Sequence, residues 1–390
     1  MTQEFRPDTI RLTKELSDIV KKKNGIYCTP KSIRDQLFTC LNNLQPQKIL
    51  EPSFGSGEFL FDLLERFPNS DITGVEFNQT LFQSISSDKI HLIHQDFSTF
   101  TSTTKYDLII GNPPYVVVKT KETKCMKGRG NLFVLFIYWC LTRHLAPNGY
   151  LTFVLPTSFL NCSYYEPCRQ YIFNHCSVIQ LILCSSFKWL DTSQSTMILI
   201  LQNRPENTDI HSYFIQKHGL FLTPYYKEIQ ILFNEGKTLQ ELGFNVKTGS
   251  IVWNQNKQVL TDNPNDVLLL YETNLTKNNG YMLNNIKQKA KKQYIPLQTK
   301  KPIQEPCLVI ARGFGNQYQL RYAYIPKEIR FYGENHVNII TSPNQDELLI
   351  KKLTDSLKDE RTLKFIQMFT GNGALSKTDI QSVVPFFIEI

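Results

Sequence analysis

The feature that most constrains the fold is an alternation of short apolar runs with helix-like runs across the first half of the chain. The apolar runs predict strands at 48–51, 72–76, 90–95, 106–111, 150–155, 178–183 and 196–202. Apolar spacing and helix-start signals predict helices at 10–23, 30–42, 57–67, 78–86, 131–145 and 164–174, with Thr29 as N-cap and Pro30 as first helical residue of the second. Strands and helices in this order predict an open α/β sheet covered by helices on both faces.

The pattern changes after residue 203. A polar segment with a proline, 204–211, is predicted as a linker between a first domain, 1–203, and a second domain, 212–390. Short β-like runs at 244–252, 307–311 and 318–324 lie among Gly and Asn turns. They predict an α+β or β-rich second domain.

Composition narrows the class of protein. A net charge of +8 favours a polyanionic partner, and 41% hydrophobic residues predict a packed globular chain. The nine cysteines include no C-x-x-C pair, so we predict no metal site and buried thiols at positions such as Cys140 and Cys184. The polar N-terminus and the lack of a long apolar run predict an intracellular, cytoplasmic protein with no membrane span.

A glycine-rich turn follows the first predicted strand, in the run Glu51-Pro52-Ser53-Phe54-Gly55-Ser56-Gly57. Glycines at such a turn let the backbone approach a ligand at the carboxyl end of the strand. Leu60 stands where a third glycine of a dinucleotide fingerprint would be. A phosphate-binding P-loop is also excluded, because Ile231 precedes Gly236-Lys237-Thr238 where that motif needs glycine.

Each of the next two predicted strands ends in a carboxylate. Glu76 ends the second strand, where an acid can accept hydrogen bonds from both ribose hydroxyls. Asp96 ends the third strand and can accept from an adenine amine, with Phe97 packing on the ring. Either acid alone is more typical of a solvated loop, but their order after the glycine turn predicts a nucleoside site.

The fourth strand runs directly into Asn112-Pro113-Pro114-Tyr115. The prolines stiffen the turn and remove two backbone donors. The Asn112 side chain and the Pro113 carbonyl then offer two acceptors, and Tyr115 offers a flat ring. This combination suits a planar group that carries an NH2, such as adenine.

Taken together, these motifs resemble the γ-class N6-adenine DNA methyltransferases of type II restriction–modification systems, the TaqI methyltransferase-like group. The resemblance covers about residues 20–203 and includes an upstream Gly-x-Tyr-x-Thr-Pro segment, Gly25 to Pro30. It implies a class I S-adenosylmethionine-dependent (Rossmann-like) catalytic domain followed by a target recognition domain. The implied activity is site-specific methylation of adenine N6 in double-stranded DNA, with the target base flipped out of the duplex. We expect a monomer, with any cognate restriction endonuclease acting separately.

The resemblance also assigns roles to residues. Those implied to bind S-adenosylmethionine are Tyr27, Thr29, Glu51, Ser53, Gly55, Gly57, Glu76, Asp96, Phe97 and Asn112. Those implied to be catalytic are Asn112, Pro113, Pro114, Tyr115 and Phe187, the last stacking on the target adenine opposite Tyr115. A core role for Phe187 remains open, and Trp189 is a nearby aromatic alternative.

Three further segments are candidates for DNA contact. A basic loop spans 119–130, a second basic stretch spans 287–301, and 312–317 is glycine-rich with side chains of base-reading types. For the first segment phosphate contact is favoured over a solvated surface loop, and for the second a solvated face fits the sequence equally well.

Two other functions fit parts of this pattern. One is an RNA or protein-glutamine methyltransferase, because glutamine-modifying enzymes also carry Asn-Pro-Pro-Tyr. The other is a non-catalytic DNA-binding module that keeps the same fold.

Overall fold

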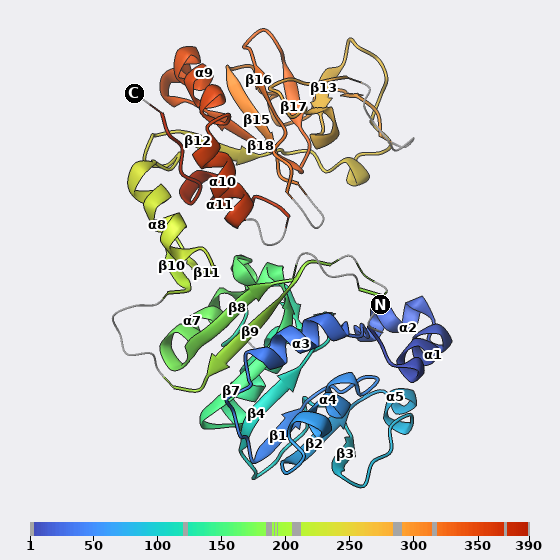
Figure 1. Ribbon diagram of the computed structural model, residues 1–390. Coiled ribbons are helices and arrows are strands. Elements are labelled where there is room, and N and C mark those ends of the chain that lie inside the picture. The colour runs from blue at the N-terminus through green and yellow to red at the C-terminus, as the bar shows by residue number, and fades with distance from the viewer. Residues whose placement is uncertain are drawn as a thin grey trace. The chain divides into compact units, whose positions relative to one another are not determined.

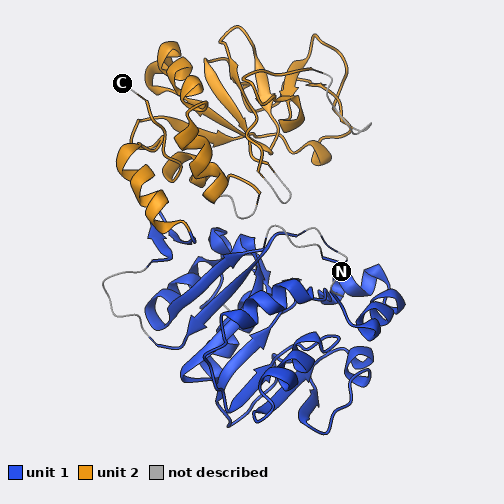
Figure 2. Cartoon of the chain, in the orientation of Figure 1, with its two compact units in different colours: residues 1–224 blue, residues 225–390 orange. Residues whose placement is uncertain are grey.

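The chain folds into two compact units, Met1–Pro224 and Tyr225–Ile390 (Figure 2). The structure is a computed structural model that describes residues 4–119, 124–184, 189–190, 192, 194–204, 212–283, 291–313, 318–369 and 373–388 (Figure 1). Among these residues, no helix has the length and apolar character needed to cross a membrane.

The first unit is built on a sheet with the strand order β3-β2-β1-β4-β7-β9-β8. The strands are β1 (Lys48–Glu51), β2 (Asp71–Glu76), β3 (Ile90–His94), β4 (Tyr106–Gly111), β7 (Leu145–Pro156), β8 (Ser177–Leu183) and β9 (Thr196–Gln202). All neighbours pair in parallel except β9, which is antiparallel to both β7 and β8. This order, with its single reversed strand, is that of a class I S-adenosylmethionine-dependent methyltransferase, so the predicted fold class is confirmed.

The strand order reverses direction between β1 and β4, which lie side by side. Ligands of open α/β sheets bind at such a switch point, outside the carboxyl ends of the strands. The glycine turn follows β1 and Asn112 follows β4, so the fold brings these two motifs together at that place.

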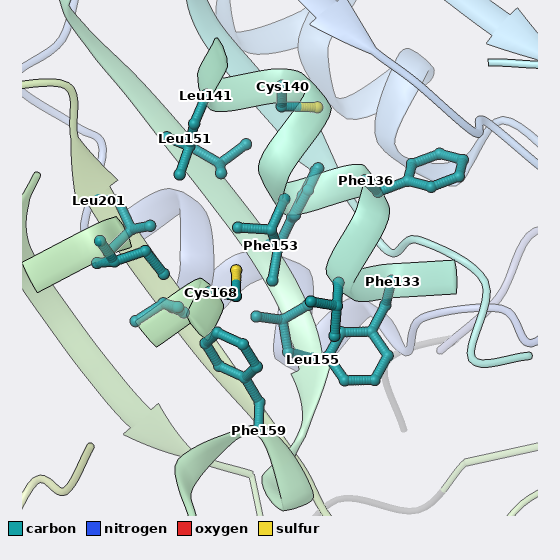
Figure 3. Packing of buried hydrophobic residues seen from close by; sticks show 14 of the residues in the cluster. Phe133, Phe136, Cys140, Leu141, Leu151, Phe153, Leu155, Phe159, Cys168 and Leu201 are labelled. Atoms are coloured by element: carbon teal, nitrogen blue, oxygen red, sulfur yellow. The ribbon is translucent and has the colours of Figure 1, made fainter. Parts of the chain in front are cut away.

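The sheet is covered on both faces, which explains the nearly continuous apolar sequence of its central strands. In β9, Leu199 and Leu201 belong to one buried cluster, whereas Ile198 and Ile200 belong to the other. Figure 3 shows the first cluster, in which Phe153 and Leu155 of β7 meet side chains from the covering helices. Cys140 and Cys184 are buried, as predicted.

The helices of this unit differ in detail from those expected. They are α1 (Pro7–Glu15), α2 (Asp18–Asn24), α3 (Lys31–Thr39), α4 (Glu58–Arg66), α5 (Gln79–Gln83), α6 (Leu132–Trp139) and α7 (Glu166–His175). The single helix expected at 10–23 is two helices, because Ser17 caps α2 by accepting a hydrogen bond from the Val20 N–H. The helix expected at 131–145 changes to a π-helical turn over Cys140–His144 and runs into β7.

The expected capping role of Thr29 is wrong. Pro30 is the N-cap of α3, and the helix begins at Lys31. The Thr29 hydroxyl instead accepts a hydrogen bond from the side chain of Asn112, 83 residues away. A tertiary partner has therefore replaced the local one.

The first unit continues past its predicted end at residue 203. Most of the predicted linker, 205–211, lies outside the described residues, but the hairpin of β10 (Phe214–Gln216) and β11 (Leu220–Leu222) belongs to the first unit. The buried side chain of Arg169 donates hydrogen bonds to the carbonyls of Leu220 at 2.6 Å, Phe159 at 3.0 Å and Cys162 at 2.9 Å. This guanidinium fastens the hairpin to α7.

The second unit is α+β, as predicted in outline. An antiparallel sheet has the order β12-β18-β15-β16, and a smaller sheet has the order β14-β13-β17. The strands are β12 (Asn245–Thr248), β13 (Val267–Leu270), β14 (Tyr294–Ile295), β15 (Cys307–Ala311), β16 (Tyr322–Ile325), β17 (Phe331–Gly333) and β18 (Val337–Thr341). The helices are α8 (Tyr226–Glu235), α9 (Glu347–Ser356), α10 (Glu360–Phe369) and α11 (Lys377–Ser382).

Replacing Arg169 tests whether its hydrogen bonds, including the one to the β10–β11 hairpin, stabilise the first unit. Arg169→Met keeps most of the apolar stem but removes three hydrogen bonds to carbonyl groups, so we expect a loss of about 2–4 kcal/mol in the free energy of unfolding. Chemical denaturation followed by circular dichroism measures this loss. Arg11→Met is the control, because Arg11 is exposed and its ion-pair partner among the described residues is the exposed Asp8, and it should cost less than about 1 kcal/mol. Equal effects of the two substitutions would contradict the role of Arg169.

Candidate functional site

A cavity of about 320 Å³ lies at the carboxyl ends of β1, β2, β3 and β4. Most of the residues expected at a cofactor site line it: Tyr27, Thr29, Glu51, Ser53, Gly55, Glu76, Asp96, Phe97, Asn112 and Pro114. Gly57, Pro113 and Tyr115 are not among its lining residues. The cavity is within the usual size range of small-molecule sites.

The glycine turn and the acid of the second strand are joined directly. Gly55 and Gly57 have φ values of 56° and 79°, which favour glycine, and Gly57 is the N-cap of α4. The Glu76 carboxylate accepts hydrogen bonds from the Gly55 N–H at 2.9 Å and the Asn78 N–H at 2.7 Å. Burial raises the pKa of Glu76, although both N–H groups favour its charged form.

Asn112 is held in one orientation by the upstream segment. Its Nδ2 donates to the Tyr27 carbonyl at 3.0 Å and to the Thr29 hydroxyl at 3.1 Å. A carbonyl oxygen cannot donate, so the amide nitrogen must face Tyr27 and Oδ1 must face the other way. Within the described residues, this Oδ1 is buried and has no hydrogen-bond partner.

Close packing also holds the upstream segment against the Asn-Pro-Pro-Tyr turn. Gly25 ends α2 with φ 66°, and a Cβ atom there would lie 2.8 Å from Val116 Cγ2 and 3.0 Å from both Pro114 Cβ and the Tyr115 nitrogen. Only glycine fits both the backbone angle and this space.

A buried guanidinium connects the upstream segment to the helix that follows the glycine turn. Arg34 of α3 donates to the Thr29 carbonyl at 2.5 Å and forms ion pairs with Glu58 at 2.7 Å and Asp62 at 2.6 Å. The side chains of Arg34 and Glu58 are each 4% exposed. Such a buried pair is strongly destabilising to break, because each partner left alone is an uncompensated charge.

The third strand contributes Asp96 and Phe97. Asp96 is exposed and accepts from the Ser98 N–H through Oδ1 at 2.8 Å. Phe97 lines the cavity but is otherwise core, with its ring centroid 4.9 Å from that of Phe136.

Phe77 is a lining residue that the sequence analysis missed. It directly follows Glu76, lines the cavity and is 62% exposed, the most exposed aromatic side chain reported among the described residues. A large apolar ring left exposed beside a cavity indicates a surface that a ligand covers. Its position next to a strand-end acid is the signal that could have identified it.

Tyr115 lies beside the cavity rather than in its lining. Its hydroxyl donates to the Val154 carbonyl at 2.9 Å, and its ring meets Phe133 edge-on with centroids 5.8 Å apart. Burial, with a smaller contribution from Cys184, raises the pKa of this phenol well above its usual value, so Tyr115 stays neutral. In the described part of the chain, the Pro113 carbonyl accepts no hydrogen bond.

Several expected contact residues lie outside the described residues: Phe187, 120–123 of the first basic loop, 284–290 of the second stretch, and 314–317. The described part of the first loop closes with the short ribbon β5 (Val117–Val118) and β6 (Gly130–Asn131), and Lys127 there forms an ion pair with Glu166 at 3.1 Å. Trp189, the alternative to Phe187, packs against the core cluster that includes Cys184 and Ile198.

Comparison with known proteins shows a resemblance to one family. Residues 25–189, which contain the upstream segment, the glycine turn and Asn-Pro-Pro-Tyr, match the model of the Eco57I restriction-modification methylase family. This match covers less than half of the chain, and it lies within the first unit. The predicted resemblance to restriction–modification methyltransferases is thereby confirmed.

Two relatives are similar along almost their whole length. The Type II methyltransferase M.CvrRI of Paramecium bursaria Chlorella virus XZ-6E is 28% identical over 98% of this chain and 99% of its own. The modification methylase CviBIII of Paramecium bursaria Chlorella virus NC1A is 27% identical over 99% of each chain. The Eco57I-type family match covers only the first unit, whereas these two relatives extend through the second.

Solved structures are similar only in part. A putative class I S-adenosylmethionine-dependent methyltransferase from Listeria monocytogenes has 19% identity and a TM-score of 0.42, over 52% of this chain and 67% of that one. The strand order, rather than this similarity, identifies the fold.

S-adenosylmethionine is the methyl donor that the fold and the Eco57I-type family imply, and the cavity fits it. Two buried atoms of its lining, Glu51 Oε2 and Ser53 Oγ, have no partner among the described residues. A ligand with an ammonium group, ribose hydroxyls and an adenine amine brings the donors that such acceptors require. The carboxylates of Glu51, Glu76 and Asp96 also suit a cationic sulfonium. No group of three or more His, Cys, Asp or Glu side chains able to hold a metal occurs within the described ranges.

The raised pKa of Glu51 predicts that the stability of the protein without cofactor depends on pH. Burial, followed by the charges of Glu76 and Asp62, raises its pKa well above the ordinary value of 4.5. As pH rises through about 4.5 the unfolded chain ionises first, so folding stability falls until the folded-state pKa is passed. Glu51→Gln removes this loss, so near neutral pH it should raise the free energy of unfolding above that of the wild type, with little gain near pH 4.

Denaturant unfolding across this pH range without cofactor measures the difference. Glu65→Gln, at an exposed position of α4, is the control and should leave the pH dependence unchanged. If the stability of the Glu51 variant parallels that of the wild type at every pH, burial does not raise the pKa of Glu51.

Proposed function

We propose that the chain transfers a methyl group from S-adenosylmethionine to N6 of a flipped-out adenine in double-stranded DNA. The observation that carries this proposal is the buried Oδ1 of Asn112, which has no partner among the described residues and whose orientation is set by the Tyr27 carbonyl and the Thr29 hydroxyl. An acceptor of this kind at the edge of a nucleoside-type cavity suits an exocyclic amine. The resemblance of residues 25–189 to the Eco57I restriction-modification methylase family supports DNA as the substrate.

The chemical problem is that the N6 lone pair of adenine is delocalised into its ring. In the proposed mechanism, Asn112 Oδ1 and the Pro113 carbonyl each accept one hydrogen of the amine. These two bonds draw the nitrogen toward pyramidal geometry and make its lone pair available for in-line attack on a methyl carbon. As the N–C bond forms, the bond from that carbon to the sulfonium would break and leave a neutral thioether, and the methylated amine would lose one proton to water. The cofactor, when bound, supplies a methyl group on an electron-poor sulfonium. Catalysis then consists of positioning and electrostatic preorganisation, with no covalent enzyme intermediate.

The remaining residue roles complete the proposal. Glu76 accepts from the ribose hydroxyls, Asp96 accepts from the cofactor's adenine amine, and the rings of Phe77 and Phe97 border the adenine. Tyr115 stacks on the target base, with its hydroxyl anchored on Val154. Phe187 is the proposed second half of that clamp.

A base inside a duplex is out of reach of such a cavity, so the proposal includes base flipping. The second unit, Tyr225–Ile390, is the proposed target recognition domain. We expect the enzyme to act as a monomer in the cytoplasm, with any cognate restriction endonuclease on a separate chain.

Labelled-methyl transfer tests the substrate. Purified protein with methyl-labelled S-adenosylmethionine should label plasmid DNA, and nucleoside analysis should place the label in N6-methyladenine. Label in cytosine, only in RNA, or only in protein would reject the proposal. Cofactor binding without transfer to any of these would indicate a non-catalytic module.

Asn112→Ala tests the acceptor. The variant lacks one of two hydrogen acceptors for the amine, so turnover should fall by roughly 100-fold or more while S-adenosylmethionine binds nearly as before. Single-turnover methylation and calorimetric titration measure the two quantities. Near-normal turnover would contradict the mechanism.

Thr29→Val tests the orientation of Asn112. The methyl group fills the space of the hydroxyl but cannot accept from Nδ2, so turnover should fall by about tenfold, the equivalent of one hydrogen bond. Thr29→Ser keeps the hydroxyl and should restore most of the rate. If Val and Ser variants are equally active, the Thr29 bond has no role in catalysis.

A further inference from the structure

The second unit carries an aromatic ring flanked by two lysines. Trp253 lies in the short 3-10 turn Trp253–Gln255 and is partly buried against a core cluster. That cluster consists of Ile251, Leu260, Val267, Leu269, Tyr271, Ile295 and Tyr332. The indole is therefore fixed from below by packed side chains and keeps part of its surface open to solvent.

Two ammonium groups approach this ring. Lys257 Nζ lies 5.0 Å and Lys291 Nζ 4.9 Å from the Trp253 centroid, and Lys291 also lies 5.0 Å from the Tyr271 centroid. All three distances are within the range of cation–π attraction. Since both cations share one centroid, they lie within about 10 Å of each other.

In the described part of the chain no carboxylate lies within ion-pair distance of Lys257 or Lys291, although the charge of Lys291 acts on the carboxylate of Glu272. Neighbouring lysines differ: Lys292 pairs with Asp262 at 3.2 Å, and Lys351 pairs with Glu347 at 2.7 Å. Two like charges held on one ring repel each other, and an anion that binds between them removes the repulsion.

We infer that Trp253, Lys257 and Lys291 form a platform on the second unit that contacts the DNA backbone. The lysines of this platform would lie on successive phosphates, and the indole would lie against the deoxyribose between them. The inference rests on the proposed function for its choice of polyanion. Phosphates of one strand recur about every 3.4 Å along the helix axis, so two of them fit the span of the two ammoniums. The net charge of +8 favours such a partner. Because the contact is to the backbone, it should be independent of DNA sequence.

Salt-dependent binding tests the lysines. A fluorescein-labelled, mixed-sequence duplex is titrated with protein at several salt concentrations, and binding is followed by anisotropy. Each lost phosphate contact lowers the slope of log affinity against log salt by about 0.9, so Lys257→Gln/Lys291→Gln should lower it by about two. Lys351→Gln is the matched control: that lysine also lies near an aromatic ring, 5.5 Å from Tyr324, but is neutralised by Glu347. Its slope should match the wild type.

Two substitutions test the ring. Trp253→Phe keeps an aromatic surface and should bind within a few-fold of the wild type. Trp253→Leu removes it and should weaken binding by at least about fivefold. The fluorescence of Trp253, taken as the difference between wild type and Trp253→Phe, should change when the duplex is added.

Methylation kinetics separate the two proposals. In the double lysine variant the KM for DNA should rise far more than kcat changes, and the affinity for S-adenosylmethionine should be retained. An unchanged salt slope in this variant, with methylation intact, overturns the platform and leaves the proposed function standing. A lowered slope in a protein that methylates no DNA supports the platform and overturns the proposed function. A Lys351→Gln variant with the same loss as the double variant would show only general charge attraction and also overturns the platform.

Discussion

The buried guanidinium of Arg34 is the interaction on which the site depends. It fixes the Thr29 carbonyl, and it neutralises Glu58 at the start of the helix that follows the glycine turn. Thr29 in turn holds Asn112. One charge therefore determines the relative positions of three segments that are far apart in the sequence. Burying these charges is expensive, and the ion pairs with Glu58 and Asp62 are what make it tolerable.

The arrangement explains how an amide can present an acceptor without ambiguity. A free Asn side chain can turn either its oxygen or its nitrogen toward a ligand. Here the Tyr27 carbonyl accepts from Nδ2 and cannot exchange roles, so the oxygen is left for the cavity. Preorganisation of this kind means that no side-chain rotation is needed when an amine arrives.

The sheet and the cofactor side of the site could be predicted from sequence because their signals are local. Each strand ends where its apolar run ends, and Glu51, Glu76, Asp96 and Asn112 follow from the parallel order of strands. The predictions that differ from the structure concern residues whose partners are distant in the sequence. Thr29 looks like a helix cap until Asn112 is brought beside it, and the hairpin at 214–222 looks like part of a second domain until Arg169 reaches Leu220. In the second unit, β12 pairs with β18 across some 90 residues, and no local pattern reports such a pairing.

The separation of 85 positions between Tyr27 and Asn112 has a consequence for how the proposed activity is acquired. The contact closes a long loop, and it joins a segment that precedes β1 to one that follows β4. Local helices and the first parallel strands can form before it, but the orientation of the amide oxygen cannot. If Asn112 acts as proposed, a newly made chain becomes competent only when the two ends of this loop have met. Until then the chain can hold folded structure without the proposed acceptor in place, so methyl transfer would report on the completed topology of the unit.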